Sequence, residues 1–161
     1  MDAMPDLAAQ VLDLAREQDV KLAMAESCTG GLVSAALTEI AGSSSVVDRG
    51  FVTYSNEAKS ELLGVPMILI GTHGAVSEDV ARAMAEGALA RSHAQLAVSI
   101  TGVAGPGGGS DAKPVGLVWF ALAGAGRVTQ TLEQRFGDVG RSKVRALSVE
   151  TALTLFRDAL G

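Results

Sequence analysis

Residues 23–31 read AMAESCTGG, an apolar run that stops abruptly at small polar residues and two glycines. The segment from Lys21 to Ala25 is short and apolar, as a buried strand should be. After Gly31, apolar side chains recur at the spacing of a buried helix face. We therefore predict a strand that ends in a loop at Ser27 and leads into a helix reaching about Ala41.

The loop formed by Ser27, Cys28 and Thr29 admits two interpretations. A strand-to-helix turn offers free backbone N–H groups and the positive end of a helix dipole, which favour an anion or a developing oxyanion. Glycine at positions 30 and 31 permits positive φ and the close approach of a ligand. The alternative is a simple helix N-cap, in which Ser27 or Thr29 closes the first turn. Residues 23–31 alone leave both interpretations open.

Composition argues against several classes of function. With 161 residues, 48% of them apolar, the chain predicts a single domain over residues 1–161 that buries a substantial core. The net charge of −5 argues against nucleic acid as a partner, because binding a phosphate backbone needs clustered Lys and Arg. Cys28 is the only cysteine, so no internal disulfide can form. The first residues lack a signal-peptide pattern and no apolar run approaches ~20 residues, so we expect a cytoplasmic protein with no membrane partner.

Helix and strand patterns alternate along the chain, which predicts an α/β layer fold. Besides the helix after Gly31, helical patterns cover residues 5–17, 57–63, 77–92 and 140–160. Besides the first strand, strand patterns cover residues 96–100, 115–123 and 128–136, and a β-rich run over 46–54 that is interrupted by Asp48-Arg49-Gly50. The segment 66–74 is expected to be irregular. A hairpin at residues 124–126 puts some antiparallel pairing into the sheet.

Loops at the carboxyl ends of neighbouring strands form the site in folds of this class. Two such loops stand out: the one at Ser27 and the glycine cluster over residues 101–110, which follows the strand at 96–100. If these two strands are neighbours in the sheet, Ser27 and Thr101 face one pocket.

Several familiar sites match the sequence poorly. The glycines at 102, 105 and 107 reverse the order of the dinucleotide fingerprint, and no Lys-Ser or Lys-Thr follows them as a phosphate loop requires. Ser27 lacks the flanking glycines of the α/β-hydrolase nucleophile elbow. His73 and His93 are the only histidines, so metal-ligand spacing is absent and neither a Ser-His-Asp triad nor a Cys28 nucleophile is favoured.

A serine hydrolase without histidine can use a lysine whose proton is made easier to lose by burial or by nearby positive charge. Lys59 is the candidate base, because it follows an aromatic strand and lies in a short polar helix. Tyr54, the only tyrosine, could relay or orient the proton. The alternatives are a solvated helix lysine and a tyrosine that packs at a strand end.

Seven blocks of this sequence resemble the CinA C-terminal domain family, in the family's order and over most of the chain, from about residue 6 to residue 158. The blocks are AESCTGG at 25–31, AGSS at 41–44, RGFVTYSNEAK at 49–59, HGAVS at 73–77, GVAGP at 102–106, GG at 108–109 and KPVG at 113–116.

The resemblance implies a three-layer α/β/α sandwich with a mixed, mostly parallel sheet, and a homodimer. The family includes bacterial nicotinamide mononucleotide (NMN) deamidases, which convert the nucleotide's carboxamide to the acid and release ammonia without a metal or cofactor. It therefore implies Ser27 as nucleophile, Lys59 as general base and Tyr54 as its helper.

The substrate's phosphate needs donors, and Arg141 at the start of the last helix offers a cation. The family has a compact Gly-Asp-Arg at this point, whereas here Val139-Gly140 separates Asp138 from Arg141, and Arg145 is the reserve candidate. The residues expected to bind substrate are Thr29, Gly30, Gly31, Thr101, Gly102, Gly105 and Arg141.

Two other functions stay open at this point. One is a non-catalytic nucleotide-binding or regulatory domain linked to competence or the DNA damage response. The other is an amidase for a different pyridine or pyrimidine amide, which would keep the same catalytic residues and need no phosphate site.

Overall fold

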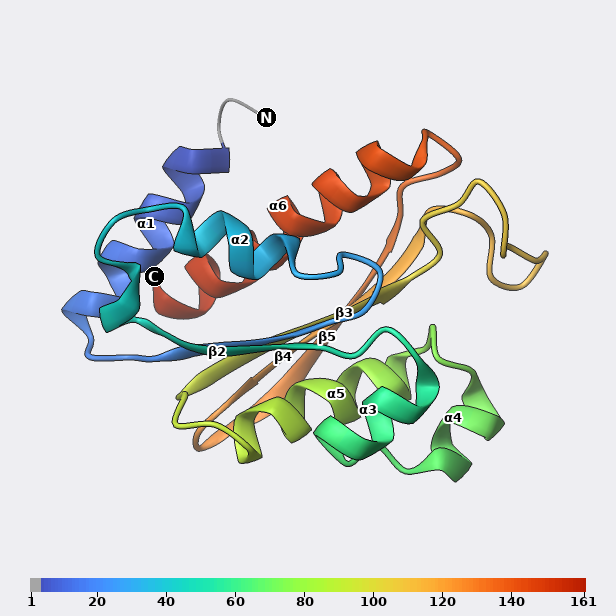
Figure 1. Cartoon of the computed structure of the whole chain (residues 1–161), viewed down its shortest axis with the longest axis horizontal. Coiled ribbons are helices and arrows are strands. Elements are labelled where there is room, and N and C mark those ends of the chain that lie inside the picture. The colour runs from blue at the N-terminus through green and yellow to red at the C-terminus, as the bar shows by residue number, and fades with distance from the viewer. Residues whose placement is uncertain (1–3) are drawn as a thin grey trace.

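The computed structural model describes residues 4–161, in which five strands form one sheet between two layers of helices (Figure 1). The strand order is β2-β1-β3-β4-β5. The strands are β1 (Leu22–Glu26), β2 (Val47–Val52), β3 (Leu96–Gly102), β4 (Leu117–Gly124) and β5 (Arg127–Arg135). Strand β1 pairs in parallel with β2 and β3, whereas β4 is antiparallel to both β3 and β5. The predicted mixed sheet is confirmed.

The helices cover both faces of the sheet (Figure 1). On one face lie α1 (Met4–Glu17), α2 (Leu32–Thr38) and α6 (Arg141–Leu160), and on the other lie α3 (Asn56–Leu63), α4 (Met67–His73) and α5 (Glu78–Ala90). A short 3₁₀ helix, Ser43–Ser45, precedes β2. Each face encloses its own apolar core, so the predicted three-layer sandwich is confirmed.

Strand β1 alternates between the two cores, as the period of a strand requires. Leu22 and Met24 pack in the core beneath α1, α2 and α6, whereas Ala23 and Ala25 pack in the core beneath α3, α4 and α5. The same alternation continues through Glu26, the last residue of β1, to Ser27, the first residue after it. The side chain of Glu26 contacts α2 on one face, and that of Ser27 contacts α3 on the other.

Two segments differ from the sequence-based expectation. Residues 66–74 were expected to be irregular, but α4 forms here, beginning after Pro66 and turning Ile70 into the core while Ile68 stays 80% exposed. The expected interruption at Asp48-Arg49-Gly50 is reduced to a shift of register at Asp48 in the pairing with β1, and all three residues lie within β2. Since β2 is an edge strand, its polar side chains reach the surface.

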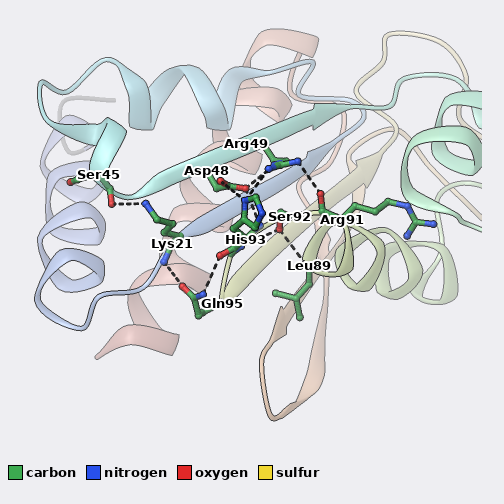
Figure 2. Close-up of polar contacts among 10 residues, drawn as sticks. Lys21, Ser45, Asp48, Arg49, Leu89, Arg91, Ser92, His93 and Gln95 are labelled. Atoms are coloured by element: carbon green, nitrogen blue, oxygen red, sulfur yellow. Dashed lines mark hydrogen bonds and ion pairs between the residues drawn. The ribbon is translucent and has the colours of Figure 1, made fainter.

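Polar contacts connect the amino-terminal ends of β2 and β3 (Figure 2). The Asp48 carboxylate accepts bonds from Arg49 Nε at 2.7 Å and from the His93 backbone N–H at 3.1 Å. Arg49 also donates to the backbone carbonyl of Arg91 at 3.2 Å. The edge strand is thereby held to the turn between α5 and β3, at the end of the sheet away from Ser27.

Two helical glycines provide a test of the packing between α3 and α5. A Cβ added at Gly87 would lie 2.0 Å from the carbonyl oxygen of Leu63, whereas one added at Gly71 would meet nothing within 4 Å. We expect Gly87→Ala to lower the free energy of unfolding by roughly 1–3 kcal/mol through overpacking. Gly71→Ala should raise it by up to about 1 kcal/mol, because alanine favours a helix. Urea unfolding of both variants measures the contrast, and equal stabilities would contradict close packing at Gly87.

Candidate active site

Ser27 and Lys59 meet at the carboxyl end of the sheet. The Ser27 backbone N–H donates to the Ile100 carbonyl of β3 at 3.0 Å, which fixes the residue at the end of β1. Lys59 lies in α3, a helix that begins at its cap Ser55, whose hydroxyl accepts from the Ala58 N–H at 3.0 Å. The Lys59 amine lies 3.1 Å from the Ser27 hydroxyl, and the two residues are only 1% and 8% exposed.

Three oxygens surround the Lys59 amine. Besides the Ser27 hydroxyl, Nζ contacts the backbone carbonyls of Thr53 at 3.0 Å and Tyr54 at 3.2 Å. Burial lowers the pKa of Lys59 from its usual 10.5, since a desolvated ammonium is disfavoured. A neutral amine has two N–H bonds and one lone pair. In that form both N–H bonds can go to the carbonyls, which leaves the lone pair for the Ser27 hydroxyl, as a general base requires.

A cavity of about 320 Å³ opens beside this pair. The parallel pairing of β1 and β3 places Ser27 and Thr101 in its wall, as expected if those strands are neighbours. The sequence-predicted residues that line it are Ser27, Tyr54, Lys59, Thr101, Gly102, Gly105 and Arg141. The Thr101 hydroxyl already donates to the Ala75 carbonyl at 2.9 Å.

Tyr54 and Arg141 meet at the mouth of the cavity. The Arg141 guanidinium donates to the Tyr54 hydroxyl at 3.1 Å and to the Gly105 carbonyl at 2.7 Å. Tyr54 is 61% exposed, and it contacts the Lys59 amine through its backbone carbonyl. The structure therefore brings Tyr54 to the pair, with its phenol directed to Arg141.

Thr29, Gly30 and Gly31 lie outside the cavity lining, although the sequence predicted them to bind substrate. Thr29 is fully buried, and its hydroxyl donates to the Glu26 carboxylate at 2.6 Å. Gly30 and Gly31 adopt φ values of 57° and 106°, which carry the chain from the loop into α2. Their placement makes them parts of the turn behind Ser27.

Glu26 is the residue of this region that sequence reasoning missed. Neither Ser27 nor Thr29 caps α2, so the N-cap interpretation of the loop does not hold. Instead, the buried Glu26 carboxylate accepts bonds from the N–H groups of Val33 at 2.9 Å and Ser34 at 3.0 Å. The signal available in the sequence was an acid that ends an otherwise apolar strand. The first turn of α2 is therefore occupied by an anion of the protein itself.

Arg145 and His73 lie outside the cavity lining, whereas Cys28 lines the cavity as a buried thiol. The Arg145 guanidinium, the reserve phosphate candidate, donates to the carbonyls of Cys28 and Thr29 at 3.1 and 3.3 Å and does not line the cavity. Burial raises the pKa of the Cys28 thiol to about 11, so the thiol stays protonated at neutral pH. His73 pairs with Asp79 at 2.9 Å. Across residues 4–161, no group of three or more His, Cys, Asp or Glu side chains is arranged to hold a metal.

The fold and this site define a class, the three-layer α/β proteins with a buried serine–lysine pair at the carboxyl end of the sheet. The profile of the CinA C-terminal domain matches residues 4–160. The chain therefore belongs to the CinA C-terminal domain family. Within residues 4–161, no helix is both long and apolar enough to cross a membrane.

Relatives and solved structures agree with this assignment. A CinA-like protein of Mycobacterium marinum is 54% identical over 157 residues, which cover 96% of this chain and 35% of that protein. A CinA-like protein of Synechococcus is 53% identical over 152 residues, which cover 94% and 36%. The chain thus spans about a third of the length of these curated relatives. The crystal structure of the competence/damage inducible protein CihA from Agrobacterium tumefaciens has a TM-score of 0.95 at 50% identity, covering 98% of this chain and 94% of that chain.

The buried amine makes folding stability depend on pH. Between the lowered pKa of Lys59 in the folded protein and 10.5, the unfolded chain holds a proton that the folded protein has lost. We therefore expect the wild type to gain stability relative to Lys59→Met as the pH rises toward 10.5. Urea unfolding between about pH 7 and about pH 10 measures the difference. Lys143→Met, which removes an exposed lysine from α6, controls for the loss of one charge. A difference that stays constant with pH would contradict the burial argument.

Proposed function

We propose that this protein is a serine–lysine amidohydrolase that converts the carboxamide of NMN to the acid, giving nicotinic acid mononucleotide and ammonia. The observation that carries the proposal is the buried Lys59 amine, 3.1 Å from the Ser27 hydroxyl beside a cavity. The substrate assignment rests on the resemblance to a family that includes NMN deamidases. The names of the relatives record only CinA-like and competence/damage inducible proteins.

In the first half of the proposed reaction, neutral Lys59 accepts the Ser27 proton as Oγ attacks the carboxamide carbon. A bond forms between Oγ and carbon, and the carbonyl oxygen becomes an oxyanion. The carbon–nitrogen bond then breaks, and the departing nitrogen takes the proton from Lys59 and leaves as ammonia. The positive pyridinium ring of NMN, when bound, further favours the neutral form of Lys59.

The oxyanion needs hydrogen-bond donors near Ser27. Within the described residues, the backbone N–H groups of Cys28 and Thr29 donate to no backbone carbonyl. The N–H of Ser27 itself is taken by the Ile100 carbonyl. Cys28 lines the cavity and Thr29 does not, so the Cys28 N–H is the best candidate on the nucleophile side of the cavity.

In the second half, water attacks the acyl carbon while Lys59 accepts one of its protons. The bond between Oγ and carbon breaks, Ser27 takes that proton from Lys59, and nicotinic acid mononucleotide leaves. Each cycle consumes one water and returns both side chains to their starting protonation. This sequence needs no metal or cofactor.

Arg141 is the best candidate for recognising the 5′-phosphate. Its guanidinium lines the cavity and stands at the first residue of α6, where the helix dipole also favours an anion. The glycine loop at 105–108 lines the same wall and permits a phosphate to approach the backbone closely. A phosphate at this point would compete with the Tyr54 hydroxyl for Arg141.

Ammonia release from NMN tests the proposed reaction. We expect Ser27→Ala and Lys59→Ala each to lower kcat by at least about 10³-fold, because nucleophile and base act as a unit. Circular dichroism and unfolding curves establish that both variants fold. If the folded wild type binds NMN without releasing ammonia, the enzyme assignment fails and a nucleotide-binding domain replaces it.

Arg141→Leu tests the phosphate assignment. We expect KM for NMN to rise by about 10-fold or more, because a charge-assisted pair to phosphate is lost. The same variant should leave kcat/KM for nicotinamide riboside, which has no phosphate, within about threefold of the wild type. Lys143→Met removes an exposed cation from the same helix and is the matched control. An equal loss toward NMN and the riboside would indicate a disturbed loop instead of a missing phosphate contact.

A further inference from the structure

The Glu26 carboxylate is a fully buried charge that the proposed chemistry does not use. It belongs to the residue directly before Ser27, yet it faces α2 on the opposite side of the sheet from Lys59. Burying a carboxylate is costly unless hydrogen bonds compensate it. The bonds that Glu26 accepts therefore indicate what it holds in place.

Five donors surround this carboxylate. Its Oε1 accepts bonds from the Thr29 hydroxyl at 2.6 Å, the Val33 N–H at 2.9 Å and the Gly31 N–H at 3.3 Å. Its Oε2 accepts bonds from the N–H and the hydroxyl of Ser34 at 3.0 and 2.7 Å. The carboxylate thus connects the turn that follows Ser27 to the first turn of α2.

A cation from α6 also holds this turn. The Arg145 guanidinium donates hydrogen bonds to the carbonyls of Cys28 and Thr29. A Cβ added at Gly30 would lie 3.4 Å from the Nη2 atom of Arg145. In a planar peptide, a carbonyl and the following N–H point in opposite directions. Fixing the Cys28 carbonyl therefore fixes the direction of the Thr29 N–H.

We infer that Glu26 is a positioning residue, which holds the turn carrying Ser27 through its bond to the Thr29 hydroxyl, with Arg145 as its counterpart. The inference rests on the proposed function, in which Ser27 is the nucleophile and the Cys28 N–H is the candidate oxyanion donor. Glu26 touches no substrate; it acts through the geometry of the turn. Small displacements of reacting groups are expensive, about 10²-fold in rate for about 1 Å.

Two hydroxyls separate this role from simple helix capping. Thr29 and Ser34 bond to the same carboxylate at 2.6 and 2.7 Å, one from the turn and the other from the helix. A cap alone would respond to the loss of either hydroxyl by losing stability. If Glu26 positions the turn, losing the Thr29 hydroxyl should lower kcat, whereas losing the Ser34 hydroxyl in the helix should not.

The test compares Thr29→Val, Thr29→Ser and Ser34→Ala in the full chain, with ammonia release from NMN as the readout. We expect Thr29→Val to lower kcat by about 10-fold or more with KM unchanged. Thr29→Ser keeps the hydroxyl and should restore kcat to within about threefold, and Ser34→Ala should do the same. Unfolding curves show whether each variant is folded. Equal losses of kcat in Thr29→Val and Ser34→Ala, or no loss in Thr29→Val, would overturn the inference.

A second measurement does not depend on the substrate. Hydrogen exchange of the backbone amides of residues 28–30, followed by mass spectrometry, should be faster in Thr29→Val than in Ser34→Ala. If the wild type releases no ammonia, the proposed function fails while the exchange comparison still decides whether Glu26 holds the turn. Exchange at the same rate in both variants would contradict the positioning role whatever the substrate is.

Discussion

The Lys59 amine is removed almost entirely from water, and the surrounding structure compensates this burial. A buried ammonium without partners would be strongly disfavoured, so the fold must supply acceptors and also makes the neutral amine easier to form. The acceptors are the carbonyls of Thr53 and Tyr54, the two residues that follow β2, together with the Ser27 hydroxyl. An edge strand of the sheet, the helix after it and the end of β1 are therefore joined at one nitrogen.

Strand direction explains why the other cavity residues gather at this point. Strands β1, β2 and β3 are parallel, so the loops after all three leave the same end of the sheet. Strand β4 runs in the opposite direction, so β5 again ends at the cavity end of the sheet. Arg141, which begins the helix after β5, therefore lines the cavity. The antiparallel hairpin thus places the glycine loop before it and the start of α6 after it on one side of the site.

Hydrophobic periodicity predicted the fold class and most elements, because helices such as α5 have a hydroxyl cap and a regular apolar stripe. It missed α4, because the helix begins with four consecutive apolar residues, 67–70, which form no one-sided stripe. It also split β2 at polar residues that an edge strand tolerates. The proximity of Ser27 and Lys59 depends on strand order, which periodicity does not encode. The family resemblance implied the roles of the two residues without giving that order. The sequence did not reveal that the Thr29 side chain turns to Glu26 and away from the cavity. The direction of a side chain across a turn is a tertiary property, which periodicity does not encode.

The Asp48 contacts lie at the amino-terminal ends of β2 and β3, a full strand length from the cavity (Figure 2). The Arg49 side chain in this ion pair is 42% exposed, and partly exposed pairs add little stability individually and are weakened by salt. Because no bond of this group reaches Ser27 or Lys59, substitutions there change how firmly the edge strand is held without altering the chemistry. One end of the sheet can therefore adapt to a new temperature or salinity while the other end keeps the geometry of the buried serine–lysine pair.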